Sequence, residues 1–326
     1  MPPPSPLPRR HGLEAAWVVT PDRHTAPPSR WPSMGAWLRD KVDERVDVER
    51  LLAEARFVYG DGRPVRDDDP YATTAFVWFH RDLRDEPVVP GELTVVHRDE
   101  RVVVVDKPAF LSTVPRGNHV VQSLVVRLRD QLGLPDLTTM HRLDRVTSGL
   151  VLCVVGKEHR AAYQSMFATG TVAKTYRALA PWRAGLAGSD GVVVRNHIRA
   201  VPRTGRAEVV PDAPVNAETL VEVERRLGGP DDLAVYRLSP RTGRTHQLRL
   251  HLLGLGVPIV DDPLYPVDRQ VPIDDFSEPL QLLAAELAYV DPVDGQVRHH
   301  RSARRLPLRA QGDQDEGSRQ LRRDPN

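Results

Sequence analysis

Cysteine is the residue that this sequence of 326 amino acids most conspicuously lacks, because Cys153 is the only one. One thiol cannot form an intramolecular disulfide, and cysteine-based zinc sites need at least two such ligands. Long apolar runs are also missing, since no stretch reaches 18 apolar residues and five of the first eight residues are prolines. A membrane span or a secretory signal needs an apolar core at such places. We therefore expect a cytoplasmic protein with no membrane segment.

Lysine is scarce as well, since only four of the 45 cationic residues are lysines. The net charge of +1 is unevenly spread, with 16 acidic against 10 basic residues between Gly35 and Glu100, and five arginines without an acid between Arg298 and Arg309. Arginine suits phosphate and stacked bases, although genome base composition produces the same bias. These charges allow a polyanionic partner without requiring one.

Several motifs of common enzyme classes are absent from the sequence. It contains no GxxxxGK[ST] or GxGxxG phosphate loop, no GxSxG elbow and no HExxH. His246 and His251 are five residues apart, whereas two zinc ligands on one helix face need a spacing of four. We therefore expect no metal site, and nucleotide hydrolysis, hydride transfer and serine esterase chemistry lose their usual support.

Composition divides the chain into four parts. Residues 1–33 carry nine prolines among polar residues and are expected to form a disordered tail. Residues 34–90 form a small N-terminal segment, and residues 91–309 form the main domain. Residues 310–326 are polar and charged without an apolar period, so a second disordered tail is expected there.

Apolar periodicity in the main domain predicts an α+β fold. Strands are expected at 93–97, 102–106, 150–155, 172–180, 217–224, 233–238 and 282–289, and helices at 123–132, 157–169 and 245–255. Two further helices, 36–41 and 48–55, are expected in the N-terminal segment. Ser123 is the expected cap of one helix, and Thr242 or Thr245 of the last. Because strands outnumber helices and do not alternate strictly with them, we expect a mixed, largely antiparallel sheet with flanking helices.

Three polar segments interrupt apolar runs where core packing does not require it. In His141–Gly149, Asp144 lies on a loop that enters a buried strand, a common place for a catalytic carboxylate; a plain turn in which Asp144 bonds the local backbone explains the spacing too. In Lys174–Arg177, strand alternation places Lys174 and Tyr176 on one face, and a tyrosine there stacks on a base or packs in an ordinary sheet.

The third polar segment is Arg241–His251. Arg244 lies at the entrance of the last expected helix, where a fixed guanidinium can clamp a carboxylate in bidentate fashion. A solvated basic helix start fits the same residues equally well.

Taken together, these segments resemble a known family. HRLDRVTSGL at 141–150, KTYRAL at 174–179 and RTGRTHQLRLHLLGLGVPIVDDPLY at 241–265 are similar to the three signature blocks of RluA-type pseudouridine synthases. The resemblance continues through VVHRDERVVVVDKP at 95–108 and LLAAELAYVDP at 282–292, and it covers roughly 93–308 in the expected order.

The resemblance implies a mixed sheet with a central cleft and an enzyme that converts uridines of tRNA or ribosomal RNA into pseudouridine without metal or organic cofactor. It implies that Asp144 is the catalytic carboxylate and that Arg244 pairs with it, which favours the ionised carboxylate. It also implies that Tyr176 stacks on the flipped-out uracil and removes the C5 proton. We expect the enzyme to work as a monomer.

Further substrate-binding positions follow from the same resemblance. Arg142 would occupy the space that a flipped base leaves, with His141 supporting its loop. Leu248 would form an apolar wall of the uracil pocket, and Lys107 and Lys174 would have structural or phosphate-facing roles.

The sequence departs from the family pattern at several positions. Phe110 replaces the glycine of KPxG, Ala284 stands where a histidine is usual, and the last block ends in Arg298–Arg301. These changes cast doubt on which RNA is read rather than on catalysis.

Residues 34–90 have about the size of the αL RNA-binding module of many relatives, but they are acidic. They are a degenerate copy of it or an unrelated cap. Phosphate contacts are then expected from the main domain, at Arg195, Arg199, Arg203 and the arginines of 298–309.

Two other functions remain open at this point. One is a non-catalytic RNA-binding protein that keeps the synthase scaffold. The other is a carboxylate-pair hydrolase that uses Asp144 with Asp106 or Asp262 across one pocket.

Overall fold

The computed structural model describes residues 3–10, 12–22, 30–115, 119–188, 190–202 and 204–308. The expected C-terminal tail at 310–326 lies outside these residues. The chain divides into two compact units, the N-terminal unit Met1–Asp85 and the C-terminal unit Glu86–Asn326. No helix in the described ranges is both long enough and apolar enough to cross a membrane.

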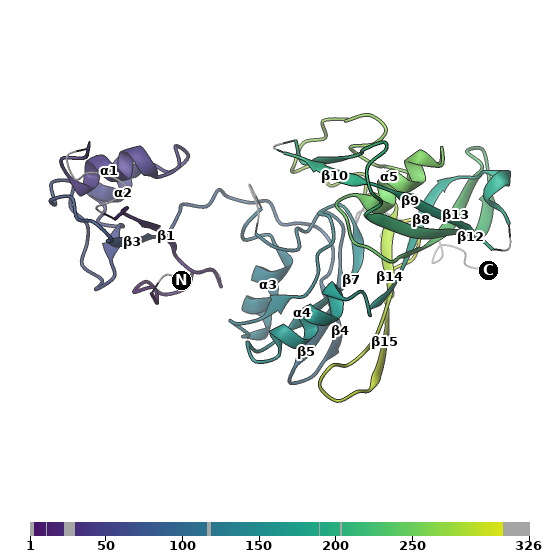
Figure 1. The fold of residues 1–326 in the computed structure, drawn as a ribbon, viewed down its shortest axis with the longest axis horizontal. Coiled ribbons are helices and arrows are strands. Elements are labelled where there is room, and N and C mark those ends of the chain that lie inside the picture. The colour runs from purple at the N-terminus through teal and green to yellow at the C-terminus, as the bar shows by residue number, and fades with distance from the viewer. Residues whose placement is uncertain are drawn as a thin grey trace, which may run out of the picture. The chain divides into compact units, whose positions relative to one another are not determined.

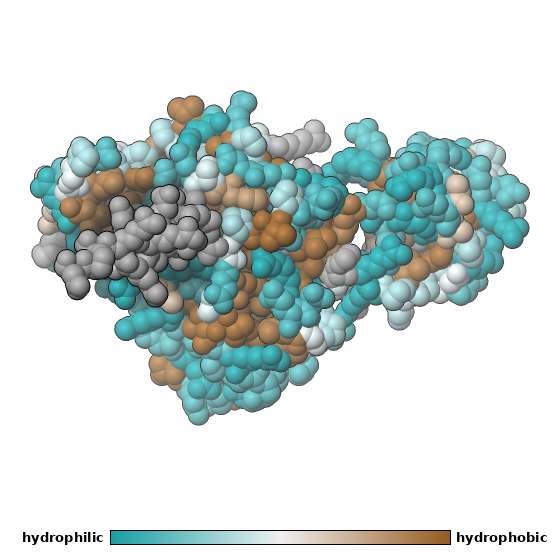
Figure 2. Space-filling model, turned by 180° about the vertical axis from the view of Figure 1, so that it is seen from behind, coloured by the Kyte–Doolittle hydropathy of each residue, from teal (hydrophilic) through white to brown (hydrophobic). Residues whose placement is uncertain are grey.

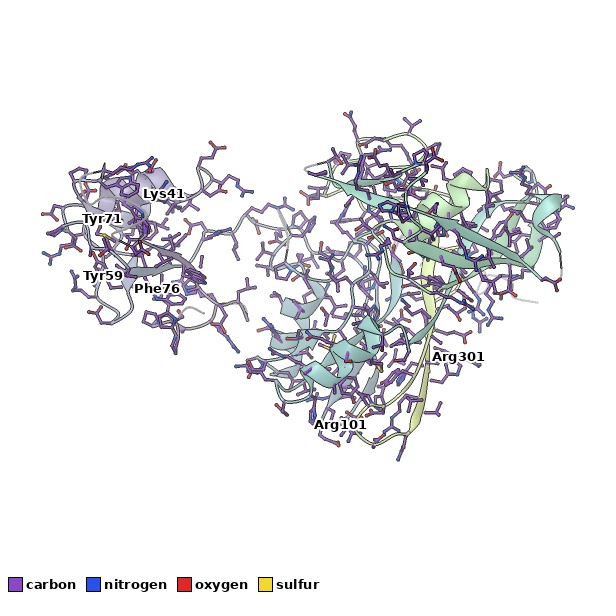
Figure 3. All side chains as sticks on the ribbon, viewed as in Figure 1. Lys41, Tyr59, Tyr71, Phe76, Arg101 and Arg301 are labelled. Atoms are coloured by element: carbon purple, nitrogen blue, oxygen red, sulfur yellow. The ribbon has the colours of Figure 1, made fainter. Side chains whose placement is uncertain are left out.

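The N-terminal unit contains two helices and a small sheet. These elements are β1 (Ala16–Val19), α1 (Met34–Lys41), α2 (Val48–Ala53), β2 (Val58–Tyr59) and β3 (Phe76–Phe79), and the strands lie in the order β1-β3-β2. Figure 3 labels Tyr59, Tyr71 and Phe76 within this unit. Its own core includes Trp37, Leu51, Phe57 and Phe79, while most of its surface visible in Figure 2 is hydrophilic.

Strand β1 departs from the expected disorder of residues 1–33. It pairs antiparallel with β3, and Trp17 faces Trp78 with ring centroids 6.3 Å apart. The apolar stretch Ala15–Val19 is long enough for an edge strand despite the prolines around it. Proline content averaged over 33 residues concealed this short segment.

The C-terminal unit is built on one large sheet in the order β4-β5-β7-β14-β8-β13-β12-β9, with β6 paired to β7 and β15 to β14 (Figure 1). The strands are β4 (Thr94–Arg98), β5 (Val102–Lys107), β6 (Thr138–Thr139), β7 (Ser148–Val154), β8 (Ala173–Pro181), β9 (Val192–Asn196), β12 (Ala217–Gly228), β13 (Leu233–Pro240), β14 (Leu282–Val290) and β15 (Val297–Arg301). Among the described pairs of this sheet only β7 and β14 run parallel. The expected α+β fold with a mixed, largely antiparallel sheet is confirmed.

The remaining elements of this unit flank the sheet. They are α3 (Leu124–Leu132), α4 (Arg160–Ala168), the 3-10 turn η2 (Ala184–Leu186), α5 (Gln247–Gly254) and the separate hairpin β10 (Ile198–Val201) with β11 (Arg206–Val209). Helix α4 packs Tyr163 and Met166 against Val104 and Leu152 of the sheet. The buried apolar runs of β5 and β7 explain why these central strands were predictable.

Two helix caps differ from the sequence-based expectation. Ser123 occupies the N-cap position of α3, but its hydroxyl donates to the Val120 carbonyl instead of capping. Helix α5 begins after His246, and neither Thr242 nor Thr245 caps it. The Gln247 side chain instead accepts from the Arg244 N–H and from the Thr242 hydroxyl, at 3.0 and 2.7 Å.

A close backbone contact joins β7 to β14 at the middle of the sheet. Gly149 has φ +114, and a Cβ placed there would lie 2.3 Å from the Ala284 carbonyl oxygen. Only glycine fits this approach. The approach fixes the end of β7 that follows the Asp144 loop.

Candidate active site

Asp144 lies on the loop between β6 and β7, and the backbone of this loop is held on both sides. The Thr113 hydroxyl donates to the Leu143 carbonyl and accepts from the Leu143 N–H, at 2.8 and 3.1 Å. The Asp144 carbonyl accepts from the Thr147 N–H at 3.1 Å. The Asp144 side chain stays 31% exposed, and it lines a pocket in the middle of the sheet. The local turn therefore exists, but it uses the Asp144 backbone, and the carboxylate faces the pocket.

The buried Lys107 side chain also holds the loop of Asp144. Its ammonium donates to the carbonyls of Pro108, Leu111 and Arg145, at 3.0, 2.8 and 3.2 Å. Burial lowers the pKa of Lys107, with Asp144 opposing the shift, yet three carbonyl acceptors require the three N–H bonds of an ammonium. Lys107 is thus placed for the structural role and away from phosphate.

The guanidinium beside Asp144 belongs to Arg249, which corrects the expected pairing with Arg244. Arg249 Nη1 lies 3.4 Å from Asp144 Oδ2. The exposed Arg244 side chain lines the same pocket, but its Nε donates to the Asn216 carbonyl at 3.0 Å. Both arginines belong to the third polar segment, and the fold brings the second of them to the carboxylate.

Asp262 orients Arg249 from behind. Its two carboxylate oxygens accept from Arg249 Nε and Nη2 at 2.8 and 2.6 Å, and Oδ1 also accepts from the N–H groups of Leu264 and Tyr265. The Arg249 side chain is only 1% exposed, and although burial opposes it, the Asp262 and Asp144 charges raise the pKa of Arg249. This bidentate clamp leaves Nη1 for Asp144.

A sequence signal for Arg249 existed. It stands in the run 248–253, in which four of six residues are leucine, so that a helix there buries most of its circumference, as the structure shows for 247–252. A charged residue inside such a run is buried, and buried charges are almost always paired. The spacing could therefore have indicated a buried ion pair, although not which carboxylate completes it.

Tyr176 and Lys174 reach the pocket from β8, on the face that strand alternation predicts. Tyr176 lies between Leu238 of β13 and Ala284 of β14 in the sheet register. Burial and, second, the Asp144 charge raise the pKa of the Tyr176 phenol. Burial lowers the pKa of Lys174, and its amine has no hydrogen bond or ion pair within the described ranges.

Of the other predicted substrate-binding residues, two line the pocket and one packs behind the pocket wall. Leu248 and the exposed Arg142 line the pocket, and Arg142 makes no ion pair with the described residues. His141 lies behind them, where its Nε2 accepts from the Leu152 N–H at 3.1 Å and its ring stacks on Phe167 at 4.7 Å. Burial lowers the pKa of His141 to about 3, with the Lys174 charge as second cause.

A wider groove continues from the pocket along several loops. Its walls come from 112–114, 138–146, 167–176, 241–249 and 263–271. Phe110, which replaces the family glycine, has φ 66 and contacts Phe276 at 5.5 Å. Arg145 lies over the Phe110 ring at 5.6 Å and donates to the Ile273 carbonyl at 3.1 Å. These contacts tie the 263–278 segment to the loop of Asp144.

Most arginines that were expected to contact phosphate are paired with carboxylates. Arg195 pairs with Glu218 at 2.7 Å and Arg199 with Glu208 at 2.5 Å. Arg298 pairs with Asp294, and Arg304 with Asp106, at 2.8 and 3.1 Å. Figure 3 places Arg301 on the long β14–β15 hairpin, where Glu286 lies 3.8 Å away. Arg203 and Arg309 lie outside the described residues.

The carboxylate-pair hydrolase loses its geometric support. The Asp106 carboxylate accepts from Ser302, Ala303 and Arg304, and the Asp262 carboxylate is occupied by Arg249. Neither carboxylate lines the pocket into which Asp144 opens. Within the described ranges, no group of three His, Cys, Asp or Glu side chains is arranged to hold a metal ion.

Comparisons with known proteins identify the family of this chain. The family model described as RNA pseudouridylate synthase matches residues 101–253. The dual-specificity RNA pseudouridine synthase RluA of Vibrio cholerae is 34% identical over 201 residues, which cover 61% of this chain and 78% of that protein. The RluA of Pasteurella multocida is 34% identical, with coverage of 64% and 91%.

Solved structures show the same fold. Human RNA pseudouridylate synthase domain containing 4 matches with a TM-score of 0.50 and 26% identity over 65% of this chain and 88% of that one. Human RNA pseudouridylate synthase domain containing 1 matches with a TM-score of 0.53 and 24% identity over 74% and 99%. The chain therefore belongs to the RluA-type family and is an RNA pseudouridine synthase.

Proposed function

We propose that this enzyme converts specific uridines of ribosomal RNA or tRNA into pseudouridine, with Asp144 acting on the ribose of a flipped-out nucleotide. The observation that carries the proposal is that Asp144, Arg249 and Tyr176 line one pocket although they come from three distant parts of the chain. A partly exposed carboxylate, a buried guanidinium and an aromatic ring are the groups that this reaction needs.

The reaction is an isomerisation, so every atom is conserved. The N1–C1′ bond breaks, the uracil turns, the C5–C1′ bond forms, and the proton that leaves C5 is balanced by one gained at N1. The Asp144 carboxylate either attacks C1′ or removes the C2′ proton to form a glycal. Both routes use the ionised carboxylate, which the Arg249 charge 3.4 Å away stabilises.

Tyr176 stacks on the uracil and takes part in the C5 proton transfer. Its raised pKa keeps the phenol protonated, so the phenol oxygen accepts the C5 proton only as its own proton moves on. Asp144 is the neighbouring anion whose charge contributes to that shift, which makes it the natural acceptor. Stacking is worth about 1–3 kcal/mol per base. Flipping costs a few kcal/mol, so the two terms are of similar size.

The remaining pocket residues support binding. Arg142 is exposed and unpaired among the described residues, as a side chain that fills the place of a flipped base must be. Lys174 has no ion-pair partner among the described residues and offers its amine to a phosphate or a carbonyl, and Leu248 gives an apolar wall. The His141 ring accepts from Leu152 of β7 and so ties the loop to this strand, and Lys107 holds the loop backbone at Arg145.

The N-terminal unit is proposed to be a degenerate copy of the αL module or an unrelated cap. Both fit a small unit with its own core. A monomeric state and a cytoplasmic location stay predictions, which size-exclusion chromatography with light scattering and cell fractionation test.

Pseudouridine maps of total RNA from cells with and without the gene test the function. We expect one or a few positions to lose pseudouridine and to regain it with the wild-type gene but not with Asp144→Asn. In vitro, Asp144→Asn should bind the mapped RNA and fail to release tritium from C5-labelled uridine. Unchanged maps together with retained RNA binding would favour the non-catalytic RNA-binding protein.

A further inference from the structure

His246 is a pocket residue that the sequence reasoning did not assign to the site. It directly precedes helix α5 with φ 55, and its side chain is only 8% exposed. Its two ring nitrogens face different groups. Nδ1 lies 3.0 Å from Tyr265 Oη, and Nε2 lies 3.8 Å from Asp144 Oδ2.

The partners of Tyr265 determine which nitrogen of His246 carries the proton. The Tyr265 hydroxyl accepts from the Ala207 N–H at 2.8 Å and donates to the Ala207 carbonyl at 2.8 Å. Ala207 is buried, so turning the hydroxyl away would leave its carbonyl without this bond. A phenol has one proton and two lone pairs, and its remaining lone pair faces His246. Nδ1 of His246 therefore carries the proton and donates it to Tyr265.

The Nε2 lone pair of His246 consequently points towards the Asp144 carboxylate. Two hydrogen-bond acceptors then face each other across 3.8 Å with no proton between them. Burial lowers the pKa of His246, which keeps the ring neutral; Asp144 and Asp262 oppose this shift, while Arg249 and Arg206 add to it. The Nε2 lone pair is therefore an acceptor beside the carboxylate, on a residue that lines the pocket, and a substrate donor can use it.

We propose that this donor is the 2′-hydroxyl of the target uridine, which donates its single proton to the His246 Nε2 lone pair while Asp144 faces the adjacent C1′ and C2′. The inference rests on the proposed function, because that function places Asp144 at C1′ or C2′ of the ribose. Within an RNA chain the 2′-hydroxyl is the only ribose hydroxyl, since the 3′ and 5′ oxygens are esterified. The base has one donor, N3–H, which is three bonds from C1′. Only the 2′-hydroxyl is attached to the carbon next to C1′.

This contact makes His246 a specificity-determining residue that distinguishes RNA from DNA at the target position. The 2′-hydroxyl is the group by which a protein tells the two nucleic acids apart at one site. The hydrogen bond also holds C1′ and C2′ against the carboxylate. Tyr265 is a positioning residue, because it sets the tautomer of His246 from outside the pocket.

The test compares the mapped RNA with the same RNA carrying 2′-deoxyuridine at the target, using single-turnover rates of the full-length enzyme. His246→Asn keeps an amide near the Nδ1 position for Tyr265 but removes the acceptor at Nε2. His246→Gln places an amide oxygen near Nε2 and serves as the conservative rescue. If the deoxyuridine RNA does not react, the dissociation constants of the two RNAs are compared instead. This comparison remains valid at equilibrium, because the pseudouridine formed from the uridine RNA keeps its 2′-hydroxyl.

We expect the wild type to prefer the uridine RNA by about 10- to 100-fold, the range of one hydrogen bond to a charged or buried partner. His246→Asn should reduce this preference to a few-fold, and His246→Gln should restore part of it. An unchanged preference in His246→Asn would overturn the inference while leaving the enzyme a pseudouridine synthase. Absence of pseudouridine formation by the wild type in any RNA would instead remove the proposed function itself.

Discussion

Arg249 Nη1 lies 3.4 Å from Asp144 Oδ2, while its other nitrogens are held by Asp262. One fully buried cation thus serves two carboxylates. Arg244, only five positions earlier, reaches the pocket from its exposed rim. The two arginines have different tasks, which separate substitutions reveal.

Arg249→Met should destabilise the protein by about 3–5 kcal/mol and abolish activity, because it leaves the buried Asp262 without its cation. Arg244→Met should change the free energy of unfolding by less than about 0.5 kcal/mol, as surface substitutions usually do. Urea unfolding and tritium release measure both. Arg249→Lys keeps the positive charge beside Asp262 but not the bidentate geometry. This variant should therefore fold and still lose activity, which separates the two effects. Equal stability losses in the two methionine variants would contradict the assigned pairing.

Tyr176→Phe should keep RNA binding within about 1 kcal/mol of the wild type, because the ring still stacks on the base. Loss of the phenol oxygen should block the C5 proton transfer, so C5–H exchange and pseudouridine formation should fall to background. Tyr176→Leu should weaken binding by about 1–3 kcal/mol in addition. Full turnover by the phenylalanine variant would assign the proton transfer to another group.

Acid should destabilise the protein through His141. Its pKa of about 3 in the folded state lies below the value of about 6.5 expected for an unfolded chain. The unfolded chain therefore binds a proton as the pH falls below about 6.5, and the folded chain does so only near pH 3. Stability from this group is complete above pH 6.5 and decreases towards pH 3, by about 1.4 kcal/mol per pH unit at most.

The check is the free energy of unfolding of the C-terminal unit as a function of pH. His141→Gln keeps an acceptor for the Leu152 N–H and should flatten the decrease between pH 6 and 4 relative to wild type. The partly exposed His159 provides the control His159→Gln, which should leave the slope unchanged. The same slope in wild type and His141→Gln would show that His141 is not involved.

Phe110→Gly should release the 263–278 segment from the Asp144 loop. The variant loses a phenylalanine ring that is only 6% exposed, at a cost of about 3–5 kcal/mol, together with its contacts to Phe276 and Arg145. Relief of the left-handed backbone, about 1–2 kcal/mol, offsets part of this loss, so the free energy of unfolding should fall by about 1–4 kcal/mol. KM for the RNA should rise, whereas kcat should stay near the wild-type value. Arg145→Met should raise KM in the same way without altering the backbone at residue 110. An equal loss of kcat would indicate that Asp144 itself has moved.

Local patterns were sufficient for the middle of the fold. The buried runs of β5 and β7 and the alternation in β8 predicted the strands that carry Asp144 and Tyr176 to one pocket. The short strands β1 and β3 were missed, because their apolar stretches are brief and surrounded by prolines and polar residues. The hairpin β10–β11 was also missed, since its strands of four residues carry little periodic signal.

The position of a site residue could be predicted where a single candidate of its type lies on a loop or strand of known direction. Asp144, Tyr176 and Lys174 lie where the sequence blocks suggested, because a loop and a strand face define their direction. The sequence did not show whether Arg244 or Arg249 pairs with Asp144, because this depends on where helix α5 begins. The helix begins after His246, and neither Thr242 nor Thr245 caps it. The tautomer of His246 depended on Ala207 and Tyr265, which are far from it in the sequence.

The approach of Gly149 to Ala284 restricts which residue can stand at position 149. Between β7 and β14 two halves of the sheet meet side by side in the same direction, with no room for even one methyl group at residue 149. Any larger residue would wedge these halves apart and carry Asp144 on one half away from Tyr176 on the other. The position of the Asp144 carboxylate relative to the Tyr176 ring thus depends on the absence of a side chain at residue 149.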